Sequence, residues 1–525
     1  MSLKEIFELA IKNHQNNNLK AAENFYKKTL KIEPNHMGAL INLGLVFKGL
    51  GELEKASNHF KNVIEIDPNH TFALNNLGLV LQEVGKFEKA LNYFKKVIEI
   101  DPSYKDAHFN YGNTFSSLNE YQKALNCYQK VIEIDPSYKQ AFNNLGVAFQ
   151  ELGRYQEALN SYQKAIQIDP GYKDALNNIG GIFKKLGQYK KAMSFYEKLI
   201  KIDPNYKDAL NNIGVVFHEL GQYEKAMSFY EKAIKIDPNF TRAHFNRGVL
   251  LYERGKYENA MEVLKLINFK NSNSYLLSCL FKLDRPSVFQ ELLNKIIKIK
   301  EGNGFDAMIG SSCSRSKLKY GINISNPFCN DPLNYVLKRN LTELCDFNNI
   351  FVKTIRNILD KNNIPLKNQG LLTNGIQTSG NFFNYEVEVT NKIKNIIHSE
   401  IENYKKNFAN TDEGFLKKFP HRYTLNAWLV SMKSGGKLDA HMHENGWLSG
   451  SIYINVPKNI KGDSGNLVVC IEKDYEKDKK QNVKKSINVV TGNMCLFPAS
   501  LLHYTVPFES EEERIVLAFD VIAKN

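Results

Sequence analysis

The sequence predicts a multidomain protein, with an all-α superhelical solenoid followed by an α+β domain that has a closed antiparallel, jelly-roll core. Two observations carry this prediction. A unit of 34 residues recurs through the first half of the chain, and short alternating runs typical of strands begin at Tyr423. The length of 525 residues suits about three domains. We expect a repeat array at 1–274, a helical connector at 275–345 and a C-terminal domain at 346–525, with its β core at 423–525.

The repeat is marked by a glycine, an alanine and a proline that each return every 34 residues. The prolines are Pro34, Pro68, Pro102, Pro136, Pro170, Pro204 and Pro238. This pattern resembles the tetratricopeptide repeat, and the resemblance covers about residues 3–274. We count eight units, of which the first and the last depart from the pattern as capping units do.

Each unit is expected to form two antiparallel helices. In the unit 139–172, Gly146 and Ala158 are small because the two helices cross closely, and Pro170 ends the second helix. One unit cannot cover its own apolar face, so the core arises from stacking of neighbouring units.

The first helix of most units also carries an asparagine at 34-residue spacing. These are Asn42, Asn76, Asn110, Asn144, Asn178, Asn212 and Asn246. Because the first helices line the concave face of such arrays, the amides could grip the backbone of a protein or peptide partner. The row resembles the asparagine ladder of the nucleocytoplasmic N-acetylglucosaminyltransferase. The alternative is that asparagine is simply inherited with the repeat.

The chain between the array and the β core has mixed character. We expect helices in the connector and near 347–361 and 385–406, and loops at 304–316 and 370–383. The second loop, rich in Thr, Asn and Gly, is a candidate cover for an active-site mouth.

Eight strands are predicted in the β core, and their spacing suits a closed antiparallel barrel or jelly roll. They lie near 423–432, 437–443, 450–457, 465–472, 485–490, 494–498, 502–507 and 513–522. The charged insert 472–485 is expected to be a solvated loop.

Three histidines and one arginine stand out in this core. His441 and His443 are two residues apart, so both can point to one face of a strand. A neighbouring strand can bring His503 to the same point, and three imidazoles suit iron, zinc, copper or nickel. Arg514, on the last strand, can clamp a carboxylate with its two-pronged guanidinium.

The order of these residues resembles the Fe(II)/2-oxoglutarate oxygenases, whose double-stranded β-helix carries HxD/E, a later histidine and a downstream basic residue. The segments LSGSIYINVP and GNMCLFPASLLHYTVP are similar to a bacterial branch that is found joined to tetratricopeptide arrays. The resemblance covers roughly 346–525 and implies a dioxygenase with Fe(II) and 2-oxoglutarate. It implies that His441 and His503 are metal ligands, and that Arg514 holds the distal carboxylate of 2-oxoglutarate, with Tyr453 as a candidate second donor.

One position departs from the family pattern. Where the family usually has a carboxylate ligand, this chain has His443. Three interpretations follow: three imidazoles hold the metal, Glu444 or Asp439 replaces His443, or the activity has been lost.

The resemblance implies hydroxylation of a protein or peptide that the array recruits. The main alternative is a non-catalytic tetratricopeptide scaffold for protein–protein interaction with a degenerate barrel. A metal-dependent cupin that does not use 2-oxoglutarate would leave Arg514 without a role.

The composition and charge of the chain limit the classes of binding partner and the cell compartment that we expect. The net charge of +13 comes from lysines spread along helix faces, without an arginine-rich block, so we expect no nucleic-acid partner. The start of the chain lacks an apolar signal core and no long apolar run follows, which predicts a cytoplasmic protein without a membrane partner. Seven cysteines without a CxxC pair favour reduced thiols.

Overall fold

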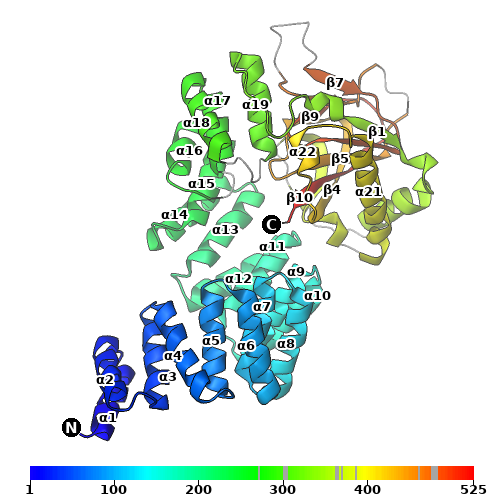
Figure 1. Ribbon diagram of the computed structural model, residues 1–525. Helices are drawn as coiled ribbons and strands as arrows, with labels where there is room; N and C mark the ends of the chain where they lie inside the picture. The colour runs from blue at the N-terminus through cyan, green and yellow to red at the C-terminus, as the bar shows by residue number, and fades with distance from the viewer. Residues whose placement is uncertain are drawn as a thin grey trace. The chain divides into compact units, whose positions relative to one another are not determined.

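A computed structural model describes residues 1–269, 272–299, 306–360, 366–367, 371–384, 387–458, 462–473 and 483–524. By the density of contacts the chain divides into two compact units, Met1–Ile182 and Phe183–Asn525. The helices of the array stack as antiparallel pairs within each unit (Figure 1).

The helices of the array lie where the 34-residue period predicts them. The first unit holds α1 (Leu3–Gln15), α2 (Leu19–Ile32), α3 (Met37–Gly49), α4 (Leu53–Ile66), α5 (Thr71–Glu83), α6 (Phe87–Ile100), α7 (Lys105–Ser117), α8 (Tyr121–Ile134), α9 (Lys139–Glu151), α10 (Tyr155–Ile168) and most of α11 (Lys173–Lys185). The second unit continues with α12 (Tyr189–Ile202), α13 (Lys207–Glu219), α14 (Tyr223–Ile236), α15 (Thr241–Glu253) and α16 (Tyr257–Leu264).

Close crossing of the paired helices explains the repeated glycine. A Cβ on Gly146 would lie 2.6 Å from the ring of Tyr162, which is fully buried in the partner helix. Gly44 faces Phe60 and Gly214 faces Tyr230 in the same way. Each repeat therefore closes its core by pressing an aromatic ring onto a helix backbone.

Three helices follow the array: α17 (Ser272–Lys282), α18 (Pro286–Ile299) and α19 (Ala307–Tyr320). The loop predicted at 304–316 is wrong for its described part, because residues from Ala307 onward are helical. Asp306 caps the helix by accepting a hydrogen bond from the Ile309 amide, and Gly321 ends it in the left-handed conformation. Gly310 lets the helix approach Phe328, so tertiary packing stabilises a helix that lacks a clear apolar period.

The C-terminal part is rich in antiparallel strands. Its strands are β1 (Leu337–Asn340), β2 (Leu366–Lys367), β3 (Leu372–Thr378), β4 (Tyr423–His441), β5 (Leu448–Asn455), β6 (Leu467–Cys470), β7 (Lys484–Ile487), β8 (Asn493–Pro498), β9 (Leu502–Thr505) and β10 (Arg514–Ala523). The order along the sheet is β1-β8-β5-β10-β4-β9-β6-β7, with β3 also paired to β4.

The long strand β4 joins two halves of this sheet. Its first part pairs with β10 and its last residues pair with β9. The bend falls at Gly435 and Gly436: Gly435 has a φ of 72°, and a Cβ on Gly436 would lie 2.6 Å from the carbonyl oxygen of Lys433. The two strands predicted at 423–432 and 437–443 are therefore one bent strand.

Side chains of the central strands point alternately to two cores. Ile515, Leu517 and Phe519 of β10 pack toward the helices η3 (Asn348–Lys353), α20 (Thr354–Asp360) and α21 (Val387–Asn407). Tyr453 and Val516 face the opposite way, toward Leu467 and Val469 of β6. The sheet thus has a helix-covered outer face, on which α21 lies (Figure 1), and an inner face enclosed between its two halves.

The segment predicted as a loop at 370–383 is corrected in its described part. Residues Leu372–Thr378 form β3, which pairs with β4 across a register shift at Thr373 and Gly375. A turn-like residue, Asn374 with a φ of 48°, lies inside this strand and hides its strand character in the sequence. The predicted charged loop at 472–485 lies mostly outside the described residues.

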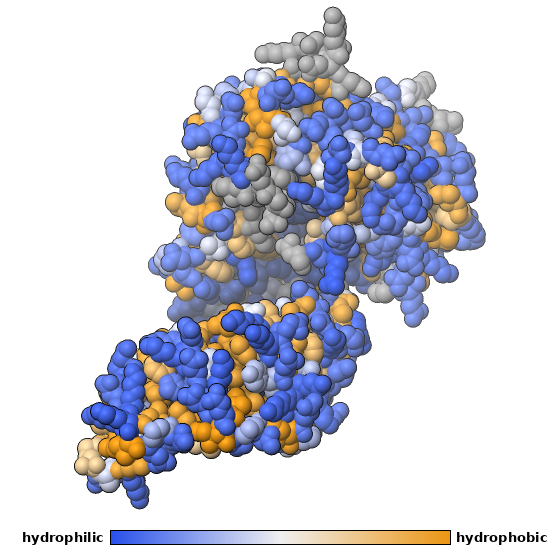
Figure 2. Space-filling model, viewed as in Figure 1, coloured by the Kyte–Doolittle hydropathy of each residue, from blue (hydrophilic) through white to orange (hydrophobic). Residues whose placement is uncertain are grey.

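Hydrophilic residues cover much of the face that Figure 2 shows. Figure 2 shows apolar side chains gathered mainly over the repeats of the first unit, amid charged and polar ones. Within the described residues, no helix combines the length and the apolar character needed to cross a lipid bilayer.

Candidate metal centre and anion site

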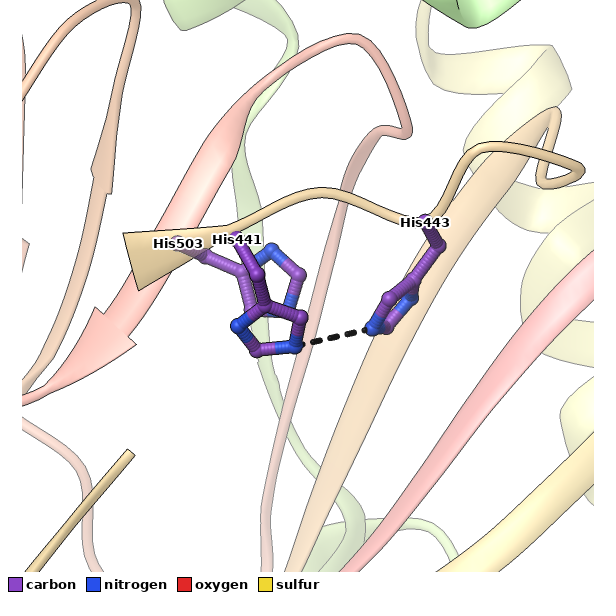
Figure 3. A group of neighbouring side chains, drawn as sticks. All are labelled: His441, His443 and His503. Carbon is purple, nitrogen blue, oxygen red and sulfur yellow. Dashed lines mark hydrogen bonds between the residues drawn. The ribbon is translucent and has the colours of Figure 1, made fainter. Parts of the chain in front are cut away.

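Three histidines meet at the inner face of the strand-rich part. His441 is the last residue of β4 and lies opposite His503 of β9 in the strand register. His443 follows two residues later in the loop that leads to β5, and its ring points back toward the other two (Figure 3). The sequence prediction that these three side chains converge is matched by the geometry.

The imidazoles are spaced as ligands of one ion would be. One ligand nitrogen from each ring lies within 4.8 Å of the others. The Nε2 atoms of His441 and His443 are 3.2 Å apart. Two nitrogens at right angles on a metal with bonds of ~2.1 Å would lie about 3.0 Å apart. The cluster therefore fits a metal site.

The outer nitrogens of two rings are fixed by oxygen acceptors. Nδ1–H of His441 donates to the backbone carbonyl of Asp439 over 2.9 Å, and Nδ1–H of His443 donates to the carboxylate of Asp520 over 2.7 Å. Both Nε2 atoms then present lone pairs to each other, and they require a cation between them, either a proton or a metal ion. The third imidazole beside them favours a metal ion.

Burial keeps two of the rings neutral. Burial, followed by the neighbouring imidazole of His443, lowers the pKa of His441 to about 4. The same causes hold the pKa of the buried His503 well below its usual value. Nδ1 of His503 has no hydrogen-bond partner in the described part of the chain. Neutral imidazoles are the form that binds metals, so no proton has to leave these two rings first.

The two carboxylates considered as substitutes for His443 do not join the cluster. Asp439 is half exposed and lies 3.3 Å from the ammonium of Lys437. Glu444 accepts a hydrogen bond from the hydroxyl of Tyr275 in α17, and burial raises the pKa of Glu444 to about 8. Met442, between the two histidines, packs with Tyr275 in a core of the last repeat.

Arg514 is a buried cation at the start of β10, with only 1% of its surface exposed. Its guanidinium donates to the backbone carbonyl of Gly465 over 3.2 Å and to the hydroxyl of Thr505 over 3.5 Å. Nε has no partner, and no carboxylate pairs with Arg514 among the described residues. A buried charge without a counter-charge costs several kcal/mol, so this side chain is prepared for an anion.

The anion site and the histidine cluster share strand β9. Thr505, which contacts Arg514, is two residues from His503 and points to the same face. This spacing corresponds to ~6.6 Å along a strand. Tyr453 is buried beside Arg514, with its ring centroid 5.1 Å from the guanidinium carbon. A small dicarboxylate bound by Arg514 would therefore lie next to the histidines.

Three residues of the site were missed in the sequence: Thr505, Ser449 and Asp520. The hydroxyl of Ser449 donates a hydrogen bond to Asp520 over 2.8 Å, and Asp520 also accepts the hydrogen bond from the ring of His443. A signal existed for Asp520, because it follows Arg514 by an even number of residues in an otherwise apolar strand and so shares its face.

The predicted row of asparagines lies on the first helices of the repeats, half-buried except for the buried Asn76. Four of them donate to an asparagine of the preceding repeat: Asn110 to Asn75, Asn144 to Asn113, Asn178 to Asn143 and Asn246 to Asn211. Asn76 donates to the carbonyl of Phe72 in its own helix, and Asn212 accepts from Lys184. Contacts between repeats thus use part of five of these amides, and a role in peptide binding stays a prediction.

Comparisons with known proteins find two kinds of family model along the chain. Residues 426–520 match the family model described as "Putative 2OG-Fe(II) oxygenase". Models of the tetratricopeptide repeat match at 38–70, 72–104, 93–126, 112–153, 140–172, 180–221, 208–240 and 229–262. No curated protein matches the chain.

Several solved structures resemble the array. A tetratricopeptide repeat protein from Parabacteroides merdae is 19% identical and covers 47% of this chain and 98% of its own, with a TM-score of 0.42. MamA is 25% identical and covers 32% of this chain and 92% of its own, with a TM-score of 0.30. YrrB, described as a TPR protein with an unusual peptide-binding site, is 26% identical and covers 36% of this chain and 96% of its own, with a TM-score of 0.30.

Proposed function

This chain joins tetratricopeptide repeats to a C-terminal 2OG-Fe(II) oxygenase domain, and from that premise we propose that it is an Fe(II)- and 2-oxoglutarate-dependent dioxygenase that hydroxylates a protein or peptide. One observation carries the proposal: three convergent imidazoles lie beside a buried arginine for which the described residues offer no counter-charge. A metal ion and a carboxylate satisfy both groups at once.

The metal would be held by Nε2 of His441, Nε2 of His443 and a ring nitrogen of His503. Three protein ligands that leave one side of the ion open are typical of non-haem iron oxygenases, and here His443 would take the place that a carboxylate usually has among them. The backbone carbonyl of Asp439 and the carboxylate of Asp520 fix the first two rings, so their lone pairs are already oriented.

Arg514 would bind the distal carboxylate of 2-oxoglutarate, with Tyr453 packed against its guanidinium. When bound, the iron and the cosubstrate would supply the oxygen chemistry that converts 2-oxoglutarate, O2 and a substrate C–H group into succinate, CO2 and a C–OH group. The apolar neighbours Phe497 and Val469 keep the inner face dry, which strengthens the attraction between Arg514 and an anion.

The repeats would recruit the substrate as an extended peptide along the asparagine-bearing helices. We place the recruiting array at 1–274 and the catalytic domain at 346–525, with the connector 275–345 between them, in a cytoplasmic protein.

An anaerobic titration with Fe(II) followed by 2-oxoglutarate tests this function. The wild-type protein should bind one Fe(II), then one 2-oxoglutarate, and release succinate on exposure to air. His441→Ala should remove the first event, and Arg514→Lys should weaken the second. Absence of metal binding by the wild-type protein would contradict the enzyme and favour a non-catalytic scaffold.

A further inference from the structure

We infer that Asp520 is a positioning residue of the metal centre, which orients His443 and supplies the negative charge that a set of three imidazoles lacks. The inference rests on the proposed metal site and goes beyond its ligands. It explains how a chain with histidine at the usual carboxylate position can still hold a divalent ion.

The carboxylate lies one imidazole away from the point where the three rings converge. Oδ1 of Asp520 accepts Nδ1–H of His443 over 2.7 Å, while Nε2 of the same ring faces His441. A carboxylate that hydrogen-bonds to a metal-binding histidine fixes the tautomer of the ring and makes its free nitrogen a stronger ligand. Asp520 therefore acts on the ion through His443.

Asp520 is held in place on several sides. It is 5% exposed, and its Oδ1 also accepts the hydroxyl of Ser449 over 2.8 Å. A Cβ on Gly446 would lie 3.2 Å from Oδ1, so the turn after His443 closes directly over the carboxylate. The amide of Trp447 donates to the carbonyl of Val521 over 2.7 Å, which ties this turn to β10.

Charge balance gives the second reason. Three neutral imidazoles leave both positive charges of a divalent ion uncompensated, and Arg514 adds another buried positive charge on the same face of β10. In a site of low polarity these charges repel one another strongly. Among the described residues, Asp520 is the carboxylate in contact with the cluster, since Asp439 and Glu444 pair elsewhere.

Substitution of Asp520 by asparagine tests the effect of the negative charge alone, because the two side chains have nearly the same shape. Asn can still accept Nδ1–H of His443, so Asp520→Asn removes the charge and leaves the ring in place. We expect Fe(II) and Co(II) to bind roughly 10–100-fold more weakly, as for other carboxylates behind a ligating histidine. The visible spectrum of the Co(II) form should also shift, because the ligand strength of His443 falls.

A matched control and a second variant complete the experiment. Glu413→Gln neutralises another buried carboxylate, which accepts the amide of Asn330 over 2.8 Å, and should leave metal affinity and spectrum unchanged. Ser449→Ala removes the second donor to Asp520 and should weaken binding less than Asp520→Asn. Circular dichroism checks that each variant is folded.

The outcomes distinguish this inference from the proposed function. If the wild-type protein binds neither Fe(II) nor Co(II), the proposed function is contradicted, and the role of Asp520 that rests on it falls as well. If the wild-type protein binds and folded Asp520→Asn binds equally well with the same Co(II) spectrum, the role of Asp520 is overturned while the metal site stands.

Discussion

His441 and His503 are directly opposed across the β4–β9 ladder, with ring centroids 4.3 Å apart. Their register depends on the bend at Gly435 and Gly436, which carries β4 from β10 to β9. The candidate metal centre is thus built on the point where the two halves of the sheet meet, a rigid location for side chains that must hold a fixed geometry.

His441→Ala should abolish stoichiometric Fe(II) binding, because two remaining imidazoles hold the ion weakly. The helical circular dichroism signal should stay the same, since His441 ends β4 and its ring lies against His443 and His503. His421→Ala, at an exposed histidine, is the control and should bind normally. Equal Fe(II) affinity of both variants would remove His441 from the site.

Arg514→Lys should raise the Kd for 2-oxoglutarate roughly 10–100-fold. Lysine keeps the charge but loses the two-pronged geometry, and one charge-assisted hydrogen bond contributes about 1.5–3 kcal/mol. Fe(II) binding should be unchanged. Arg315→Lys, which alters a different arginine paired with Glu472, is the control, and an unchanged Kd in Arg514→Lys would reject the assignment.

Gly146→Ala should destabilise the array by about 1–3 kcal/mol, because the added methyl group would press on the ring of Tyr162. Gly181→Ala is the matched control, as its Cβ would meet nothing within 4 Å. Alanine there should stabilise the helix by about 0.5–1 kcal/mol. Urea unfolding followed by circular dichroism measures both, and loss of stability in both variants would contradict the crossing argument.

Acid should weaken the first unit through His59. This side chain stacks on Phe47, and burial, followed by the charge of Lys27, lowers its pKa. The unfolded chain has the ordinary pKa near ~6.5 and so takes up the proton more readily, which means that stability is full above this value and falls as pH decreases. His59→Phe should lose less thermal stability between neutral pH and mild acid than the wild-type protein. Equal losses would exclude His59 as the cause.

Replacement of Asn144, Asn178, Asn212 and Asn246 by alanine should reduce peptide affinity by about 2–6 kcal/mol if each amide makes one net hydrogen bond. The array should also lose stability, because three of these side chains donate to the preceding repeat. Replacement of the acceptors Asn143 and Asn211 instead removes two of those contacts while the row remains. Fluorescence anisotropy with labelled extended peptides, at a temperature where all variants are folded, separates binding from stability. The peptide-groove hypothesis would be rejected if the variant without the four row asparagines lost less peptide affinity than the variant without Asn143 and Asn211.

The sequence predicts elements whose cause is local or repeated. The 34-residue period places the helices because each inner unit carries its own glycine, aromatic and proline. The convergence of His441, His443 and His503 can be predicted because the two-residue spacing of the first two and the family resemblance coincide there.

Elements caused by distant contacts could not be predicted. The helix α19 depends on Phe328 fitting against Gly310, and β3 contains a left-handed Asn374 at the register shift of its pairing with β4. The pairing of Asp520 with His443 depends on a turn that closes onto a strand far along the chain. Such relationships are properties of the assembled fold.

The contact of Met442 and Glu444 with Tyr275 limits which repeats of the array could be replaced by repeats from another protein. Residues of the metal-binding loop complete the core of the last repeat, so that repeat is not an interchangeable module. A foreign array grafted at residue 275 would replace Leu251, Val263 and Leu264, which belong to the core that Met442 packs against. Exchange of repeats, in nature or by design, is therefore expected upstream of Met227, where the shared core begins.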